Sequence, residues 1–259
     1  MVQQTVMAAE GLDKRFWQGG ERIYALSGVS FGVERGSFVA VMGASGSGKT
    51  TLLNLLAGLL RPDGGRILLD GMDFSSLGGS ERARVRRRRI GFVFQDYNLL
   101  PNLTLEENVR LPRLLDKPPE GAERWAAEIL EFLGLAGRLK HLPRQLSGGE
   151  RQRAAIARAL SMKPDIVLAD EPTGNLDLRG SSQVCGLLRR LCRERGCTVL
   201  AVTHAPHVAI HADRILMLGD GRLLSDRPVT DFADAEQLAT AYQRLLAPAA
   251  GEAGEEGRP

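Results

Sequence analysis

The sequence predicts an α/β fold with a mostly parallel sheet that is interrupted by a helical insertion and then resumed. Short β-rich runs alternate with helical patterns over most of the chain. Two of these runs, 38–41 and 166–169, are apolar at every position, which is typical of central strands buried on both faces. Between Leu99 and Met162 the strand patterns stop and only helical patterns remain.

Strands are expected from this alternation at eight places, in chain order at 5–12, 23–33, 37–42, 66–69, 90–94, 166–168, 198–202 and 214–218. Helices are expected at 50–58, after a glycine-rich turn, at 150–162, and near the end of the chain at 231–246. Within the insertion, Trp125, Ile129, Phe132 and Leu133 share one face of an amphipathic helix. The tail, 247–259, consists mainly of Ala, Gly, Pro and Glu and is predicted to be disordered.

The composition is that of an ordinary globular protein with enough apolar residues for a core, since 43% of the 259 residues are hydrophobic and 25% are charged. No apolar run approaches the roughly 20 residues that a membrane-spanning helix needs. Residues 1–11 do not have the pattern of a signal peptide. The three cysteines have no metal-ligand spacing, so we expect ordinary thiols in a reducing cytosol.

The charge is nearly balanced, at a formal +3, which argues against nucleic acid as the main ligand. One local exception is the arginine run, residues 82–89, in which six of eight positions are Arg. The run contains no aromatic residue for base stacking and leads directly into the apolar strand at Ile90. A solvated basic face is therefore favoured over a nucleic-acid or lipid site.

The strongest motif is the phosphate loop, residues 43–50 (GASGSGKT), which fits G-x-x-x-x-G-K-[ST] between a strand and a helix. Its glycines let backbone N–H groups approach phosphate oxygens at a helix N-terminus. Lys49 is expected to neutralise the β- and γ-phosphates, and Thr50 to bind Mg²⁺. A glycine-rich turn without a ligand is the alternative, but the strand–loop–helix context disfavours it. The expected nucleotide-binding residues are Gly43, Ser45, Gly46, Ser47, Gly48, Lys49, Thr50 and Thr51.

Two further motifs carry polar groups at the ends of elements. Asp170 and Glu171 end the apolar strand 166–170, where Asp170 can hold Mg²⁺ and Glu171 can act as general base toward water. The signature segment, residues 146–150 (LSGGE), precedes a helix and forms a capping box between Ser147 and Glu150. The same helix N-terminus can serve as a second anion site, and both interpretations are compatible.

The signature segment and the following RQRAAIARAL resemble the hallmark of ATP-binding-cassette (ABC) ATPases, and the resemblance extends over about residues 5 to 225. It implies that Ser147, Gly148 and Gly149 contact ATP. It also implies that Gln95 senses Mg²⁺ and the attacking water, that Asp177 faces a partner subunit, and that His204 contacts the γ-phosphate. With Glu171 and Lys49, Gln95 and His204 are the expected catalytic residues, and Thr50, Gln95 and Asp170 the expected metal ligands.

The resemblance implies a P-loop NTPase (RecA-like) core with an antiparallel β subdomain and an inserted helical subdomain. The corresponding division of the chain is 1–94 with 163–225 for the core, 95–162 for the helical subdomain, 226–246 for a C-terminal helix and 247–259 for the tail. An aromatic residue should stack on adenine. Phe16 fits better than Trp17, although core packing is an equally good explanation for either residue.

Some stretches are similar to the lipoprotein-release and macrolide-export group of ABC ATPases, notably 23–26 (IYAL) and 90–101 (IGFVFQDYNLLP). Glu150 and Phe16 depart from that group, which usually has Gln and Tyr there. Since the capping box turns Glu150 back to the backbone, we expect little loss of activity from this departure.

The resemblance implies the ATPase subunit of a membrane transporter, working as a head-to-tail homodimer with a separate permease at the cytoplasmic face of the membrane. A DNA-maintenance ABC ATPase would carry a long coiled-coil insertion, but Ser147 follows Gly43 by only 104 residues. A translation-associated ABC protein would have two cassettes, and a kinase or GTPase would lack the signature segment. The leucines at 99, 100 and 103 are candidates for the permease contact, with packing inside the insertion as the alternative.

Overall fold

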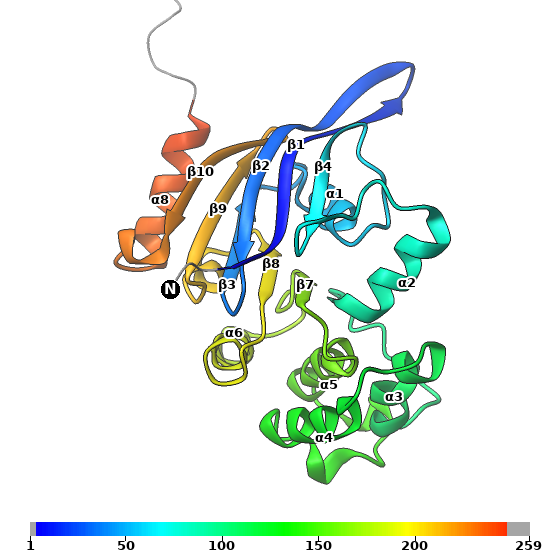
Figure 1. Cartoon of the computed structure of the whole chain (residues 1–259). Coiled ribbons are helices and arrows are strands. Elements are labelled where there is room, and N and C mark those ends of the chain that lie inside the picture. The colour runs from blue at the N-terminus through cyan, green and yellow to red at the C-terminus, as the bar shows by residue number, and fades with distance from the viewer. Residues whose placement is uncertain (1–3, 248–259) are drawn as a thin grey trace, which may run out of the picture.

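The larger of the two sheets has the strand order β10-β9-β3-β8-β7-β6 (Figure 1). The computed structural model describes residues 4–247, apart from the side chain of Gln18. Every neighbouring pair from β9 to β6 is parallel, and only β10 is antiparallel to β9. The mostly parallel sheet is thereby confirmed. Its strands are β3 (Phe38–Gly43), β6 (Ile90–Val93), β7 (Ile166–Asp170), β8 (Val199–Thr203), β9 (Arg214–Gly219) and β10 (Arg222–Pro228).

The smaller sheet is antiparallel, with the order β2-β1-β4-β5, and matches the β subdomain that the resemblance implies. Its strands are β1 (Thr5–Gln18), β2 (Glu21–Glu34), β4 (Gly64–Leu69) and β5 (Met72–Asp73). β1 and β2 are longer than expected because they pair as a hairpin out to Gln18 and Glu21. Backbone pairing between the two strands therefore extends the hairpin beyond the strand ends that the hydrophobic pattern predicts.

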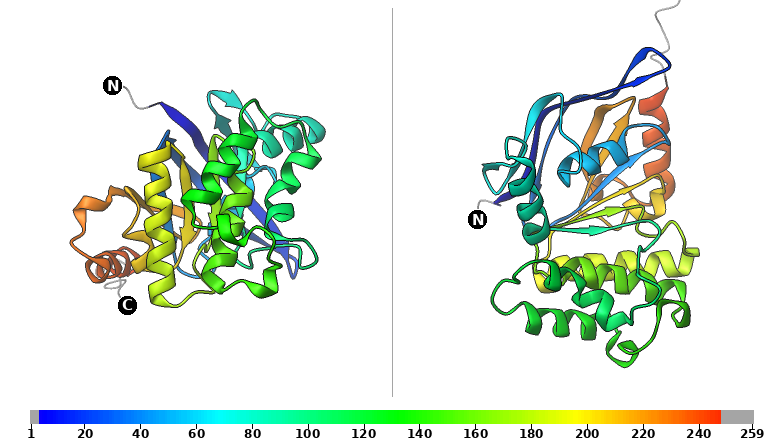
Figure 2. Two further views of the ribbon diagram at one scale, coloured as in Figure 1. Left: turned by 90° about the horizontal axis from the view of Figure 1, so that it is seen from below. Right: turned by 90° about the vertical axis from the view of Figure 1, so that its right-hand side faces the viewer.

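Helix α1 (Lys49–Leu56) lies between the two sheets, and α5 (Gly148–Leu160) and α6 (Leu178–Arg195) cover the opposite face of the larger sheet (Figure 2, right). β3 contributes to both cores. Val39 and Val41 join the cluster around α1, whereas Phe38, Ala40 and Met42 join the cluster beneath α5 and α6. Because successive side chains of a strand point to opposite faces, a strand covered on both sides is apolar throughout.

The chain between β6 and β7 is helical, as predicted. It contains α3 (Leu105–Leu115), α4 (Ala122–Phe132) and α5, with the short turns η1 (Ala136–Arg138) and η2 (Pro143–Gln145). On α4, Ile129 is fully buried, and the indole of Trp125 donates a hydrogen bond to the Leu160 carbonyl at 2.9 Å. The expected amphipathic helix is present. The exact division of the chain into subdomains stays a prediction.

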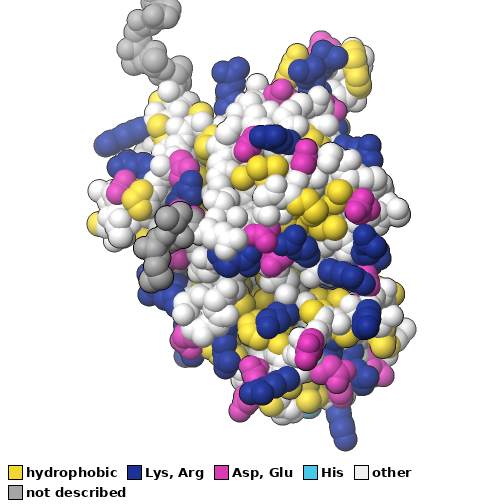
Figure 3. Space-filling model, in the orientation of Figure 1, with side chains coloured by type: hydrophobic (Ala, Val, Ile, Leu, Met, Phe, Trp, Pro, Cys, Tyr) yellow, Lys and Arg dark blue, Asp and Glu magenta, His cyan; other side chains and the backbone are white. Residues whose placement is uncertain are grey.

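The arginine run lies within α2 (Gly79–Arg89), and several of its side chains bond groups of other elements. Arg82 and Arg86 donate to the Gly58 carbonyl beyond the end of α1. Arg87 and Arg88 pair with the nearly buried Asp116, which ties α2 to the end of α3. On the face shown in Figure 3, basic and acidic side chains are interspersed. The expectation of a simple solvated face is thus incomplete, because the run also joins neighbouring elements.

The C-terminal part contains β10, α7 (Pro206–Ala209), the turn η3 (Val229–Asp231) and α8 (Ala235–Leu246). Sequence reasoning missed β10, whose exposed, polar positions give no apolar alternation. Helix α8 begins later than expected because the Asp234 side chain accepts from the Gln237 N–H and caps it there. Residues 248–259 of the predicted disordered tail lie outside the described residues. Among residues 4–247, no helix has the length and apolarity needed to cross a membrane.

Candidate functional site

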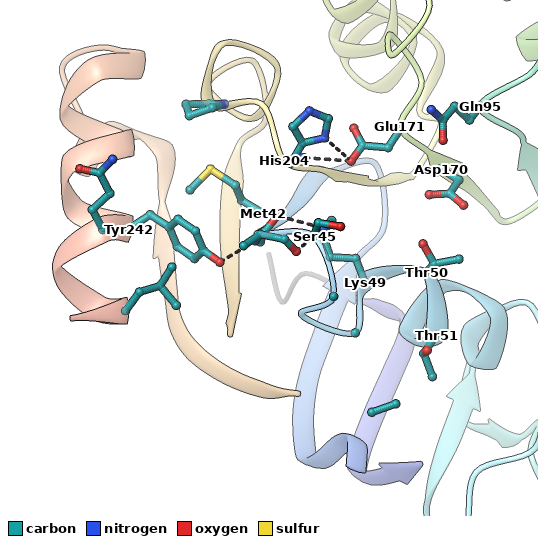
Figure 4. A pocket seen from close by; sticks show the side chains of 18 of the residues that line it. Met42, Ser45, Lys49, Thr50, Thr51, Gln95, Asp170, Glu171, His204 and Tyr242 are labelled. Carbon is teal, nitrogen blue, oxygen red and sulfur yellow. Dashed lines mark hydrogen bonds and ion pairs between the residues drawn. The ribbon is translucent and has the colours of Figure 1, made fainter. Parts of the chain in front are cut away.

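A cavity of about 810 Å³ opens where the parallel strands end at their carboxyl edge (Figure 4). The phosphate loop follows β3, Gln95 follows β6, Asp170 and Glu171 end β7, and His204 follows β8. Ligands bind at this edge of open α/β sheets because loops from several strands converge there. The structure therefore brings most of the predicted site residues into one cavity, whose lining includes Gly43, Ser45, Gly46, Gly48, Lys49, Thr50, Thr51, Gln95, Asp170, Glu171 and His204.

The phosphate loop requires glycine at Gly48, where φ is 100° and an added Cβ would lie 2.4 Å from the Ala25 carbonyl oxygen. Next to it, the Lys49 ammonium donates to the carbonyls of Gly43 at 2.9 Å and Ala44 at 2.8 Å. An ammonium has three N–H donors, so one remains for a ligand in the cavity. Burial lowers the pKa of Lys49, while the charges of Glu171 and Asp170 oppose that shift.

The predicted metal ligands offer oxygen donors of three kinds: the Thr50 hydroxyl, the Gln95 amide and the Asp170 carboxylate. Oxygen donors suit Mg²⁺, which binds through one or two carboxylates together with phosphates and water. Within residues 4–247, no group of three or more His, Cys, Asp or Glu side chains could hold a metal ion. Burial, and then the Glu171 charge, raise the pKa of Asp170, while Lys49 acts in the opposite direction. The donor set fits Mg²⁺ bound together with a nucleotide.

Glu171 is held in place by His204. Its Oε1 lies 2.8 Å from His204 Nδ1 and accepts the His204 backbone N–H at 3.0 Å. The carboxylate side chain is only 14% exposed. Glu171 also has a φ of 42°, which is costly for a residue with a side chain and is often found at functional sites. The arrangement fixes a carboxylate at the cavity wall, where it can accept a proton from water.

Arg158 and Asn175, which the sequence analysis did not single out, hold the segment 95–98 in place. Tyr97 and Asn98 have positive φ values of 61° and 49°, and their carbonyls both accept from the Arg158 guanidinium on α5. Asn175 donates from its side-chain amide to the Gln95 carbonyl at 2.9 Å. Arg158 lies in the helix that follows the signature segment, so these bonds connect that helix to the segment carrying Gln95. They are long-range contacts that no local pattern indicates.

The signature segment begins α5, and the expected capping box is present. The Ser147 hydroxyl accepts the Glu150 N–H at 3.2 Å, and Glu150 Oε2 accepts the Ser147 N–H at 2.8 Å. Arg138 also donates to Glu150, and this bond with those from Ser147 lowers the pKa of Glu150 to about 2. Ser147, Gly148 and Gly149 do not line the cavity that contains Lys49. The two segments that are predicted to bind phosphate groups therefore do not share a cavity within one chain.

Three other predicted residues do not line that cavity. Asp177 lines a neighbouring cavity of about 620 Å³, together with Glu171 and His204. Ser47 is buried within the phosphate loop, at 5% exposure. Phe16 lies on β1 and is 40% exposed, whereas Ile23 and Tyr24 of β2 line the cavity in its place. Tyr24, which sequence reasoning did not single out, is thus the nearer aromatic side chain.

A third cavity, of about 350 Å³, lies between β6 and α3. None of the three leucines at 99, 100 and 103 lines this cavity, and their role at the permease contact stays a prediction. Leu99 packs against the core, and Leu100 is 44% exposed elsewhere. The lining is largely apolar and includes Phe92, Phe94, Leu111 and Leu115, together with three arginine side chains.

The variant Glu150→Gln is expected to lower the melting temperature by about 1–4 °C at pH 7, because it removes the ion pair with Arg138 but keeps the cap. The pKa of Glu150 falls from 4.5 to about 2 on folding, so its charge stabilises the fold above pH 4.5 and that contribution disappears as the pH falls toward 2. Calorimetry should show a constant difference from pH 8 to 6 that shrinks below pH 5. A difference that stays the same down to pH 3 would contradict the assignment.

The chain is similar in sequence and in structure to known proteins. The sequence profile of the ABC transporter family matches residues 26–174. The chain is 46% identical over 221 residues to the lipoprotein-releasing system ATP-binding protein LolD of Bordetella pertussis, covering 85% of this chain and 96% of that protein. It is 44% identical over 246 residues to the macrolide export ATP-binding/permease protein MacB of Brucella melitensis, covering 95% of this chain and 38% of that protein.

The structure is similar to that of a bacterial ABC transporter cassette solved as a dimer, with a TM-score of 0.76 and 41% identity over 86% of this chain and 98% of the other. A post-hydrolysis dimer of the same cassette, bound to ADP and Pi, has a TM-score of 0.76 and 40% identity. The chain spans less than half the length of the macrolide-export relatives that it matches. The family match covers more than half of the chain and includes the phosphate loop, the signature segment and Glu171, and on this evidence the chain belongs to the ABC transporter family.

Proposed function

We propose that this chain is the ATP-hydrolysing subunit of an ABC transporter. The observation that carries the proposal is the single cavity at the carboxyl edge of the sheet, which brings Lys49, Asp170 and Glu171 together with Gln95 and His204. A phosphate loop beside two carboxylates is suited to phosphoryl transfer to water. The relatives named as ATP-binding proteins and the structure with ADP and Pi support the same reaction.

The proposal assigns the following roles to the residues of the cavity. The free N–H of Lys49 donates to the β- and γ-phosphates, and the backbone N–H groups of the phosphate loop bind the same oxygens. Glu171, held by His204, accepts a proton from the attacking water, and Gln95 orients that water. Thr50, Gln95 and Asp170 would hold Mg²⁺, which when bound neutralises phosphate charge. Aromatic stacking on adenine falls to Phe16, as the resemblance implies, or to Tyr24.

A second subunit completes the site. Ser147, Gly148 and Gly149 lie outside the cavity, at a helix N-terminus that suits a phosphate group. In a head-to-tail homodimer these residues of one subunit would cover the ATP held by the Lys49 of the other, with Asp177 at the interface. The dimeric form of the structurally similar cassette supports this arrangement.

The proposed partner is a membrane permease, which would hold the chain at the cytoplasmic face of the membrane. The apolar cavity between β6 and α3 is the docking site in this proposal, since Phe94 and Leu115 are exposed there at 36% and 68%. It lies next to Gln95, so movement at the docking site can reach the nucleotide. The names of the relatives, lipoprotein-releasing and macrolide export, support a related transport system.

The direct test is ATP turnover by the purified chain. Phosphate release should require Mg²⁺ and should stop when EDTA removes the metal, because the donors of Thr50, Gln95 and Asp170 are too few to hold it firmly without the nucleotide. A Lys49→Ala variant is the matched control and should have no measurable turnover. Equal turnover in EDTA would contradict the magnesium proposal, and turnover by Lys49→Ala would indicate a contaminating ATPase. No turnover and no ATP binding by the wild-type chain would overturn the proposed function.

A further inference from the structure

The C-terminal helix α8 forms one wall of the nucleotide cavity. Ala239, Tyr242, Gln243 and Leu246 line it, and Figure 4 shows Tyr242 reaching from α8 toward the phosphate loop. The helix is anchored by Leu238, which is fully buried. Residues 235–246 lie outside the part of the chain that matches the ABC transporter profile, so the family match assigns them no role. One wall of the nucleotide cavity is therefore formed by a segment outside the family match.

Tyr242 joins the phosphate loop to the sheet through its hydroxyl. The oxygen accepts the Ala44 N–H at 2.7 Å, and the O–H donates to the Leu218 carbonyl of β9 at 3.0 Å. Both functions of the hydroxyl, donor and acceptor, are therefore used on backbone groups. Ala44 itself is exposed, so burial does not hold this part of the loop in place.

Ala44 is also one of the two residues that hold Lys49. Its carbonyl accepts from the Lys49 ammonium at 2.8 Å, alongside the carbonyl of Gly43 at 2.9 Å. The backbone groups of Ala44 thus bond the Tyr242 hydroxyl at the N–H and the Lys49 ammonium at the carbonyl. A continuous chain of hydrogen bonds connects Leu218, Tyr242, Ala44 and Lys49.

We propose that Tyr242 is a positioning residue of the nucleotide site, which fixes Ala44 and thereby directs the remaining N–H of Lys49 toward the phosphates. This inference rests on the proposed function. A site held in its binding conformation before the ligand arrives binds more tightly, because less conformational freedom is lost on binding. The hydrogen bonds of Tyr242 go to Ala44 and Leu218 and not to Glu171, so we expect its effect on nucleotide affinity and not on proton transfer from the attacking water.

The first test is Tyr242→Phe, which keeps the ring and removes the hydroxyl. The Kd for ATP and for ADP, measured by calorimetry, should rise about fivefold to tenfold, the effect of one hydrogen bond of ordinary net strength. The kcat at saturating ATP should stay within about twofold of wild type. Arg244→Ala, an exposed residue of the same helix that does not line the cavity, is the matched control and should change neither quantity.

A second variant separates positioning from general stability. Lys49→Ala removes the ammonium that the Ala44 carbonyl holds and leaves the Ala44 N–H free to donate to Tyr242. In the Lys49→Ala background, Tyr242→Phe should raise the Kd by less than about twofold, because the ammonium that Tyr242 positions is already gone.

The outcomes are distinguishable. An unchanged Kd in Tyr242→Phe, with ATP binding by the wild-type chain intact, overturns this inference and leaves the proposed function standing. The same loss of affinity in the wild-type and Lys49→Ala backgrounds also overturns it, since the hydroxyl would then act by another route. Failure of the wild-type chain to bind ATP overturns the proposed function itself.

Discussion

Glu171→Gln is expected to slow ATP hydrolysis at least about a hundredfold while leaving ATP affinity near the wild-type value. The amide has nearly the shape of the carboxylate but cannot take a proton from water. His204 can still donate its backbone N–H to the amide oxygen, so the side chain should remain in place. Phosphate release under saturating ATP measures the rate, and equilibrium binding of ATP measures the affinity.

The same variant should trap the dimer. With hydrolysis blocked, Glu171→Gln should change from monomer to dimer on gel filtration when ATP is added, and ADP should not replace ATP. Glu150→Gln is the matched control, since it makes the same chemical change in a carboxylate that turns back onto its own helix, and its turnover should stay within about twofold of wild type. Wild-type turnover by Glu171→Gln would move the role of general base to His204.

The composite site predicts that two inactive variants restore activity when mixed. Lys49→Ala disables the phosphate loop, and Ser147→Arg disables the signature segment, so each homodimer should be inactive. In a mixed dimer one site carries both lesions and the other carries neither. With free exchange of equal amounts, half of the dimers are mixed and each has one intact site, so about a quarter of the wild-type rate should return.

Dilution provides an independent measurement of the same point. Because each ATP needs residues of two chains, the specific activity of the wild type should rise with protein concentration until the dimer is saturated. A specific activity that is constant over about a hundredfold dilution, with no rescue on mixing, would mean that the signature segment acts within its own chain or not at all. The homodimer mechanism would then have to be abandoned.

The sequence alone identified the motifs that carry the candidate site. The phosphate loop, Asp170 with Glu171, and the segment around Ser147 are short contiguous motifs, and each follows a strand or begins a helix that local periodicity reveals. Once the strands are parallel and adjacent, their carboxyl ends must lie at one edge. The capping box of Ser147 and Glu150 was predictable for the same reason, since both partners lie within one helical turn.

Contacts between distant parts of the chain were decided only by the tertiary structure. Tyr242 bonds Ala44, 198 residues away in sequence, and Arg158 bonds the carbonyls of Tyr97 and Asn98, about 60 residues away. The position of Tyr24 was likewise decided by the tertiary structure, because Tyr24 of β2 lines the cavity and Phe16 of β1 does not. Periodicity reports which face of an element is buried, but not which element covers that face. A side chain that serves a site from another element therefore has no local pattern to mark it, and only the packing of the sheets and helices determines its partner.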